Sequence, residues 1–408
     1  MDIETKNTSL ADDIAMVVIF LMAIGTVFVF SASANVSQEF NLRRFYHFPA
    51  MRQILFFPLA CLIIYTVSCF NYRKFAPAGS WFKSPVLYLL VFSIALLILV
   101  LLPQFGSEIN KARRWLRIPA GPIVISFQPS ELAKWTLILF LAAFCDKYSA
   151  ELTLYKKRFL PICLIIGLVT ALIVIEDFGT AAFLCLLSFL ILIIAGVKLW
   201  HIATLLPVGA VAFCAALLRS PGRMQRIVAF LNAEKFADSS AYQGNQSLIA
   251  LGSGGLLGKG LGMGICKYGH LPEDTTDFIF AIIGEELGFI GTTAVITLFI
   301  IFVVLGILVV VRCRDRFGQL LASGIVFAVA IQAAINIGVV TVVLPTKGIP
   351  LPFVSAGGTS MLLSATAVGV LLNIAKQSNK EILEDDKSCL AKPSSLPAEE
   401  QGDISIPL

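Results

Sequence analysis

Ten long runs of apolar residues follow one another along most of the chain, separated by polar segments. Each run is about 18 residues or longer, the length that an α-helix needs to cross a bilayer. The runs lack the period-of-two alternation of β-barrel strands. The pattern therefore predicts an all-α, polytopic membrane protein. We expect the ten spans at about residues 14–34, 53–70, 84–103, 128–145, 159–176, 178–197, 201–218, 278–311, 317–345 and 352–375.

One loop between the predicted spans is much longer than the others. It covers about residues 219–277, between the seventh and eighth spans, and ends in a group of carboxylates. We divide the chain into a polar N-terminus at 1–13, a membrane domain at 14–376 and a polar tail at 377–408. The tail is rich in Pro, Ser and Glu. Because it cannot bury enough apolar surface to fold, we predict that it is disordered.

The composition supports a membrane location and an orientation. Of the 408 residues, 57% are hydrophobic and 14% are charged, against roughly 45–50% and 25% in ordinary soluble domains. An even number of spans places both termini on one side, and the loops of that side carry the larger share of Lys and Arg. Since cytoplasmic loops are the ones enriched in positive charge, we predict that both termini are cytoplasmic.

Some positive charges oppose this bias and lie on the predicted outer side. They cluster in KARRWLR (111–117) and in the long loop, for example at Arg223, Arg226 and Lys259. An anionic partner on the outer side would explain them, and so would phospholipid headgroups.

The sequence gives no support to a disulfide framework or a zinc site. Nine cysteines are present, most of them within spans, and no two form a CxxC pair. The three histidines, His47, His201 and His270, are far apart in the sequence. The acidic N-terminus lacks the basic region of a cleavable signal, so we expect the first span to remain in the mature protein.

The long loop contains GSGGLLGKG (252–260), which resembles a phosphate-binding loop. The spacing is too short for that motif, and Gly260 replaces the Ser or Thr that would hold magnesium. A mobile loop, or close approach of the backbone to a ligand, explains these glycines better.

Glu131 and Lys134 lie three residues apart near the start of the fourth predicted span, after Pro129. Residues at this spacing share one face of a helix. Because charged groups facing lipid are unfavourable, we expect the two to pair and to face the bundle interior. The pair then either fixes helix packing or lines a polar cavity that meets substrate.

Three carboxylates precede the eighth predicted span. Glu273 and Asp274 suit the first turn of a helix, where acidic residues are favourable. Asp277 lies one turn further on, beside apolar residues, where partial desolvation would raise its pKa toward that of a general base. Glu285 and Glu286 lie within the same span and must find polar partners.

A proline- and glycine-rich segment, PTKGIPLPFVSAGGTS (345–360), interrupts the apolar pattern near the last span. Irregular backbone at membrane depth is tolerated only where it is buried in protein or lines a cavity. Ser355 then offers a hydroxyl and Lys347 a charge on the outer side. The alternative is a packing site of small residues.

These motifs together resemble the FtsW/RodA (SEDS) family, the polytopic peptidoglycan glycosyltransferases of bacterial division and elongation. The resemblance covers nearly all of residues 12–376. Its motifs are SAS (31–33), ARRW (112–115), QPSELAK (128–134), DFGTA (177–181), YQGNQSLIALGSGG (242–255), LGKGLG (257–262), LPEDTTDFIFAIIGEELGFIG (271–291) and NIGVVTVVLPTKGIPLPF (336–353).

The resemblance implies polymerisation of lipid II into glycan strands on the outer face of the bacterial cytoplasmic membrane. It places the catalytic aspartate at Asp277 rather than Asp274, as the base that takes a proton from the acceptor sugar. It matches Trp115 to the ARRW motif, and Glu131 and Lys134 to SELAK. The candidate substrate-binding residues are Trp115, Arg113, Arg114, Lys111, Glu131, Lys134, Gln243, Lys259, Lys347 and Ser355.

The implied partners are lipid II, undecaprenyl pyrophosphate and a class B penicillin-binding protein, with other membrane proteins of the divisome or elongasome. We expect no nucleic-acid partner. The departing pyrophosphate needs stabilisation, either by the cations above or by a divalent ion such as Mg or Mn. We assign no metal ligands.

Within the family, DFGTA and PTKG favour the division branch, FtsW, over the elongation branch, RodA. Three positions depart from the family pattern: IED (175–177) replaces QPD, SAGG (355–358) replaces SYGG, and CKYGH (266–270) precedes LPE. Two other functions stay open. One is a lipid II flippase, and the other is a scaffold that activates a transpeptidase.

Overall fold

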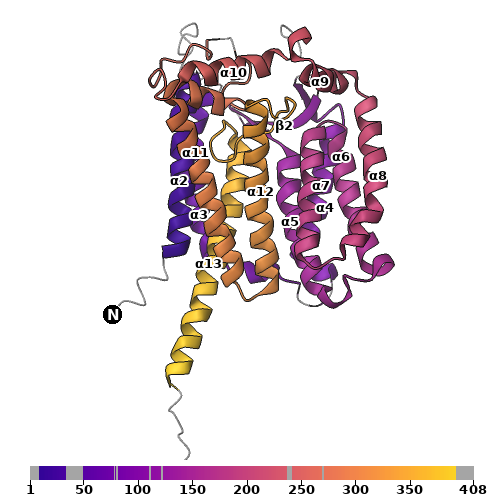
Figure 1. Cartoon of the computed structure of the whole chain (residues 1–408). Helices are drawn as coiled ribbons and strands as arrows, with labels where there is room; N and C mark the ends of the chain where they lie inside the picture. Colours follow the sequence, from indigo (N-terminus) through magenta and orange to yellow (C-terminus); the bar gives the residue numbers. More distant parts are fainter. Residues whose placement is uncertain are drawn as a thin grey trace, which may run out of the picture.

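A computed structural model describes residues 9–33, 49–77, 79, 81–109, 112–120, 123–236, 241–268 and 271–391. Every predicted span is occupied by a helix, and these helices run side by side in one bundle (Figure 1). They are α2 (Ser9–Ser33), α3 (Pro49–Cys69), α4 (Pro85–Leu101), α5 (Pro129–Lys147), α6 (Leu160–Val174), α7 (Phe178–Ile194), α8 (Leu199–Leu218), α11 (Ile279–Arg312), α12 (Arg316–Val340) and α13 (Gly358–Ala391).

Seven helical segments of the described chain are long and apolar enough to cross a membrane. They are α2, α3, α6 together with the preceding turn η5 (Tyr155–Phe159), α8, α11, α12 and α13. The apolar helices α4 and α7 have 17 residues each. The 19 residues of α5 include four charged side chains, and most of this helix is buried among its neighbours. The fold is therefore the expected all-α polytopic membrane fold.

Short one-turn helices connect several of the long ones. They are η2 (Tyr72–Phe75), η3 (Trp81–Lys83), η4 (Ser149–Glu151) and η6 (Ala233–Phe236). Local signals set several helix starts. Pro85 and Pro129 occupy the first turn of α4 and α5, where a missing N–H is harmless. Asp177 caps α7 by accepting from the Thr180 N–H, and Asp315 caps α12 by accepting from the Gly318 N–H.

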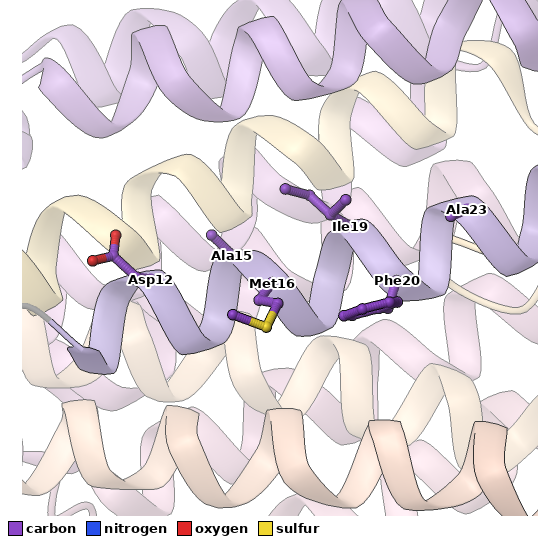
Figure 2. Close-up of a pocket in the computed structure, with 6 residues that line it drawn as sticks. All are labelled: Asp12, Ala15, Met16, Ile19, Phe20 and Ala23. Atoms are coloured by element: carbon purple, nitrogen blue, oxygen red, sulfur yellow. The ribbon is translucent and has the colours of Figure 1, made fainter.

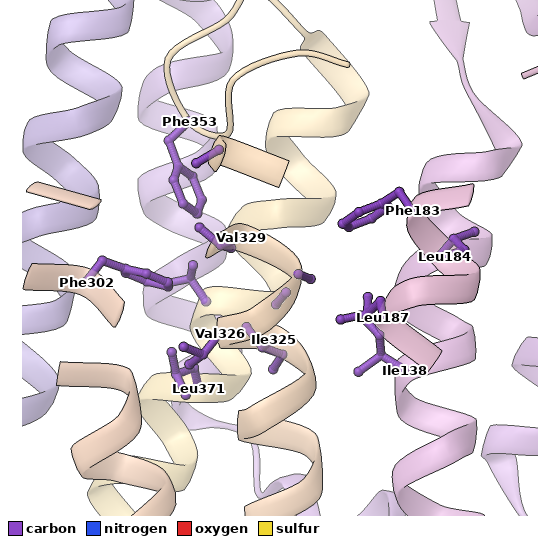
Figure 3. Close-up of a cluster of buried hydrophobic side chains, with 14 of the residues drawn as sticks. Ile138, Phe183, Leu184, Leu187, Phe302, Ile325, Val326, Val329, Phe353 and Leu371 are labelled. Atoms are coloured by element: carbon purple, nitrogen blue, oxygen red, sulfur yellow. The ribbon is translucent and has the colours of Figure 1, made fainter. Parts of the chain in front are cut away.

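The core lies around α12, which packs between α11 and α13 on one side and α5 and α7 on the other (Figure 3). Two glycines allow the close approach. A Cβ at Gly306 of α11 would lie 2.4 Å from Val326, and a Cβ at Gly324 of α12 would lie 2.4 Å from Ile138 of α5. Small residues let helix backbones pack closely in membranes, so α12 packs tightly against α11 and α5 at these two positions.

The long loop is largely ordered rather than open. It contains α9 (Pro221–Leu231) and α10 (Tyr242–Gly254), which lie across one end of the bundle (Figure 1). An antiparallel sheet with strand order β1-β2-β3 lies at the same end, where Figure 1 labels β2. Its strands are β1 (Gly106–Ile109), β2 (Ala112–Ala120) and β3 (Ile123–Phe127). The sequence pattern did not predict this sheet, and it carries most of the KARRWLR motif.

The prediction that the glycine-rich segment is a mobile loop was wrong. Its first part is α10, and its glycines approach the backbone of α11. A Cβ at Gly254 would lie 2.0 Å from the Gly284 carbonyl oxygen, and one at Gly258 would lie 2.1 Å from that of Glu286. Gly288 bends α11 at this contact with a φ of 66°. The glycines therefore serve helix packing within the chain.

The helical structure of α13 extends beyond residue 376, where the composition predicts a disordered tail. Residues 377–391 are helical, and residues 392–408 lie outside the described part of the chain. Contacts with the segment after α3 hold this extension. Arg73 of η2 forms an ion pair with Glu381, and Gln377 donates to the Asn71 Oδ1 at 2.9 Å. Such tertiary contacts supply the stabilisation that the local composition lacks.

A pocket of about 400 Å³ lies along one side of α2 (Figure 2). It is lined by Asp12 and by apolar side chains of the same helix: Ala15, Met16, Ile19, Phe20 and Ala23. None of the candidate site residues lines it.

Candidate active site

Asp277 lies in the turns that lead into α11, just before Ile279 begins the helix. Its backbone carbonyl accepts a hydrogen bond from the Asn336 Nδ2, at 2.8 Å. Its carboxylate lies against Gly348, where an added Cβ would be 2.9 Å from Oδ2. The side chain is therefore fixed between the start of α11 and the segment that carries Lys347.

The surroundings of Asp277 favour its protonated form more than water does. Its pKa rises to about 7, chiefly because desolvation penalises the charged carboxylate, and further because Glu273 and Asp177 repel it. Arg114 and Arg226 oppose the rise. Desolvation also raises the pKa of Asp274, to about 6. A carboxylate whose pKa lies near neutrality is suited to general base catalysis, and Asp277 meets this condition better.

Positive charge gathers around Asp277 from three parts of the chain. Arg114 comes from β2, Arg223 and Arg226 come from α9, and Lys347 comes from the segment after α12. Arg114 interacts with Asp277, and its Nη1 lies 3.7 Å from the Asp177 Oδ2. Its Nε and Nη2 also donate to the carbonyl of the neighbouring Glu176, at 3.0 and 2.8 Å.

Arg223 is anchored by backbone carbonyls at the ends of two spans. It donates to Val174 and Ile175, at 2.8 and 3.0 Å, and to Ala216, at 3.1 Å. Desolvation lowers its pKa, and Arg114 lowers it further. The orientation of this cation is thus set by α6 and α8.

Lys347 lies over the start of α7. Its Nζ is 4.5 Å from the centre of the Phe178 ring, a cation–π distance. A Cβ at Gly179 would lie 3.1 Å from the Lys347 Cδ. Desolvation lowers the pKa of this ammonium, Arg223 and Arg226 add to the effect, and Asp177 opposes it. An anion placed here would therefore relieve repulsion among the cations.

The remaining ARRW residues occupy other parts of the sheet. The Arg113 guanidinium lies 3.5 Å from Glu108, and its backbone N–H donates to the Glu176 carboxylate at 2.7 Å. Trp115 is half-buried, and its carbonyl accepts from Ser107. Lys111 lies outside the described residues. Of the candidates in this motif, Arg114 is the one for which an interaction with Asp277 is described.

Glu131 and Lys134 form the predicted ion pair inside the bundle. The Lys134 Nζ lies 2.8 Å from the Glu131 carboxylate and 3.0 Å from the Gln332 Oε1 of α12. Ser360 of α13 also donates to Glu131, at 2.9 Å. These partners agree with the interpretation that the pair fixes the packing of helices.

Ser355 binds backbone in this structure. It accepts from the Leu351 N–H and donates to the Thr276 carbonyl, and the neighbouring Ala356 N–H donates to Thr275 at 2.9 Å. It thus joins the irregular segment to the turn before Asp277. Gln243 lies on α10, next to Gly244, which packs against Val342.

The prediction that Lys259 serves the substrate is not supported by its contacts. Its Nζ is 2.7 Å from the buried Glu285 carboxylate. Lys267, from the atypical CKYGH segment, lies 2.8 Å from Glu286 and 3.0 Å from Ser31. Glu285 and Glu286 therefore have the polar partners that their burial requires.

Sequence reasoning did not include Asp177, Arg226 or Asn336 among the site residues. Asp177 follows an apolar span and belongs to the DFGTA motif, and Asn336 begins the NIGVV motif. Polar residues at the ends of apolar spans were the available signal. For Arg226 the signal was a positive charge on the predicted outer side, but only the folding of α9 across the bundle brings it close to Asp277.

The described residues contain no group of three or more His, Cys, Asp or Glu that could hold a metal ion. Asp177 and Asp277 are close enough for their charges to interact, but three arginines and a lysine lie around them. These four cations would balance the charge of an anion bound between them.

Comparisons with known proteins give one consistent result. The FtsW/RodA/SpoVE family, described as cell cycle protein, matches residues 12–380. The probable peptidoglycan glycosyltransferase FtsW of Coxiella burnetii is 38% identical over 87% of this chain and 93% of its own. Stage V sporulation protein E of Bacillus subtilis is 37% identical over 92% and 99%.

Two solved structures share the fold. A chain from a peptidoglycan synthase complex matches with a TM-score of 0.68 and 22% identity, over 88% of this chain and 97% of its own. The rod shape determining protein RodA of Thermus thermophilus matches with a TM-score of 0.60 and 23% identity, over 90% and 96%.

Proposed function

This chain belongs to the FtsW/RodA/SpoVE family, and from that premise we propose that it is a peptidoglycan glycosyltransferase that polymerises lipid II. The substrate is a disaccharide-peptide joined to a lipid through a pyrophosphate. The observation that carries the proposal is Asp277, a carboxylate with a pKa of about 7 beside a cluster of fixed cations.

Asp277 acts as the general base. It takes the proton from the acceptor sugar's 4-hydroxyl as that oxygen attacks the anomeric carbon of the donor. A bond forms between this oxygen and the anomeric carbon, and the bond to the pyrophosphate breaks with inversion. The electron pair leaves with the lipid pyrophosphate. A base with a pKa near 7 is ionised at neutral pH and still basic enough to accept the proton.

The cations around Asp277 stabilise the leaving group. Arg114, Arg223 and Lys347 are held before any substrate binds, by the carbonyls, the Phe178 ring and the carboxylate described above, and Arg226 adds a fourth positive charge near Asp277. Charges fixed in advance stabilise a developing anion without reorganisation. A divalent cation such as Mg or Mn, if bound together with the substrate, would supply stabilisation of the same kind.

The location of the site suits a lipid-linked substrate. It lies at the end of the bundle that carries α9, α10 and the sheet (Figure 1). With the positive charge of the opposite loops in the cytoplasm, this end faces outward and both termini face inward. The lipid tails then lie between spans while the sugars reach Asp277. A class B penicillin-binding protein, the partner expected from the family, would cross-link the product.

The decisive test uses the purified full-length protein in proteoliposomes with fluorescent lipid II, with and without a class B penicillin-binding protein. We expect glycan polymer from the wild type. We expect loss of about 10²–10⁴-fold with Asp277→Asn, the usual contribution of a general base. Asp274→Asn, a matched change three residues away, should keep most of the activity.

Other outcomes would overturn the proposal in distinct ways. Leaflet exchange of lipid II without polymer would identify a flippase. Full polymerisation by Asp277→Asn in the presence of the penicillin-binding protein would mean that the assignment of Asp277 as the catalytic base is wrong, as a scaffold role for this chain requires.

A further inference from the structure

Asn336, near the end of α12, bridges the two segments that meet at Asp277. Its Nδ2 donates to the Asp277 carbonyl and to the Ile349 carbonyl, each at 2.8 Å. The first bond holds the residue that bears the base. The second holds the segment that carries Lys347, and that presses Gly348 against the Asp277 carboxylate. A single amide therefore ties the base to the neighbouring cation.

The side-chain amide of Gln332, one helical turn before Asn336 on α12, binds the same irregular segment. Gln332 donates to the Pro350 carbonyl at 2.9 Å, next to the carbonyl that Asn336 binds. Its own oxygen accepts from Lys134, which pairs with Glu131. The ion pair of α5 thus supports the irregular segment through α12.

The Asn336 side chain is only 1% exposed, and its Oδ1 has no hydrogen-bond partner among the described residues. A buried acceptor without a partner is unfavourable. A leucine of similar size would avoid that cost, but it could not donate either bond. The donors, and not the filling of space, are what this position contributes.

We propose that Asn336 is a positioning residue for the glycosyl transfer, which sets Asp277 and the Lys347 segment at their working separation. The inference rests on the proposed function. Asn336 acts through Asp277 and does not touch substrate. Because the positioning of reacting groups is sensitive to displacements of about 1 Å, loss of this bridge slows the chemical step more than it weakens substrate binding.

The test compares Asn336→Leu with Asn373→Leu in the proteoliposome assay. Asn373 is a matched control at the opposite end of the bundle. It is 5% exposed and likewise bridges two segments, through the Ser68 carbonyl and the Tyr72 N–H. We expect Asn336→Leu to lower kcat about 10²-fold with little change in KM. Asn373→Leu should leave kcat unchanged, even if it lowers the thermal midpoint of unfolding.

The pH profile separates positioning from a general loss of structure. The charged groups that act on Asp277 are Glu273, Asp177, Arg114 and Arg226. A displaced Asp277 meets these groups at new distances, so the acid limb of kcat/KM should move in Asn336→Leu and stay in place in Asn373→Leu. Asn336→Ala, which removes the donors without adding a charge beside Asp277, should reproduce the loss in kcat.

The inference is wrong if Asn336→Leu keeps the wild-type kcat and acid limb, or if Asn373→Leu shows the same loss. It is also wrong if neither Asn336 variant gives a monodisperse protein in detergent, since Asn336 would then serve folding. Asp277→Asn, assayed beside them, distinguishes the two levels. If Asp277→Asn is inactive and Asn336→Leu is normal, only the inference fails, whereas an active Asp277→Asn overturns the proposed function.

Discussion

Gly348 and Asp277 are in direct contact across the site, and a Cβ at position 348 would lie 2.9 Å from the Asp277 Oδ2. This separation is shorter than any ordinary contact of a Cβ, so Gly348→Ala must move the carboxylate or the segment after α12. We expect a loss of about 10–10²-fold in kcat, measured by polymerisation of labelled lipid II.

The matched change for this prediction is Gly357→Ala, on the same irregular segment. A Cβ at Gly357 meets its nearest neighbour, Ser360, at an ordinary 3.5 Å. This variant should therefore keep its activity. Equal losses in the two variants would mean that the segment tolerates no side chain at all, and that the contact with Asp277 is not the cause.

The dependence of activity on pH follows from the raised pKa of Asp277. The base works as a carboxylate, and its pKa is about 7. We therefore expect kcat/KM to fall as the pH drops below about 7, rather than near the ordinary value of an aspartate. Measured initial rates from pH 5 to about 9 would place this acid limb.

Glu273→Gln should move the acid limb to lower pH. Of the two negative charges that raise the pKa of Asp277, Glu273 has the larger effect, and glutamine keeps its size while removing that charge. The control is Glu151→Gln, which changes a carboxylate that pairs with Arg158 between α5 and α6. An acid limb that stays in place in Glu273→Gln would show that a group other than Asp277 titrates.

Lys267 should matter for stability because Glu286 is fully buried. Both members of the pair are almost inaccessible, with side chains 2% and 0% exposed. Lys267→Met leaves the carboxylate without its counter-charge, a change that destabilises proteins by about 3–5 kcal/mol. Denaturant unfolding in detergent would measure this loss.

The comparison for Lys267→Met is an ion pair in contact with solvent. Glu151→Ala breaks the pair with Arg158. The Glu151 side chain is 47% exposed and the Arg158 side chain is 28% exposed. Exposed pairs contribute only about 0–1 kcal/mol. A similar loss of stability in both variants would contradict the assigned role of burial.

Gly288→Ala should destabilise the bend of α11 for two reasons. The residue has a φ of 66°, and a Cβ there would lie 2.4 Å from the Gly258 nitrogen. We expect a lower thermal midpoint. Gly167→Ala in α6, where a Cβ meets nothing within 4 Å, should be neutral or stabilise by about 0.4–1 kcal/mol. The reverse order of midpoints would refute the packing role of Gly288.

The sequence by itself determined the membrane fold, because a bilayer imposes one length and one composition on every crossing helix. It also indicated the pairing of Glu131 with Lys134, because i and i+3 positions share a helix face. The place of Asp277 beside an apolar run made its desolvation predictable, but its choice over Asp274 came from the resemblance to the family.

The tertiary structure alone decided which groups surround Asp277. The helix α9 and the strands of the sheet are too short and too polar to be read as membrane spans, so the sequence did not show that they lie across the end of the bundle. That placement brings Arg226 and Arg114 to the carboxylate. Likewise, the sequence shows Lys259 and the arginines of the same loop only as positive charges, and it does not show which of them serves a substrate. Only packing shows that Lys259 neutralises the buried Glu285, because the partner of a charge depends on distance in space and not along the chain.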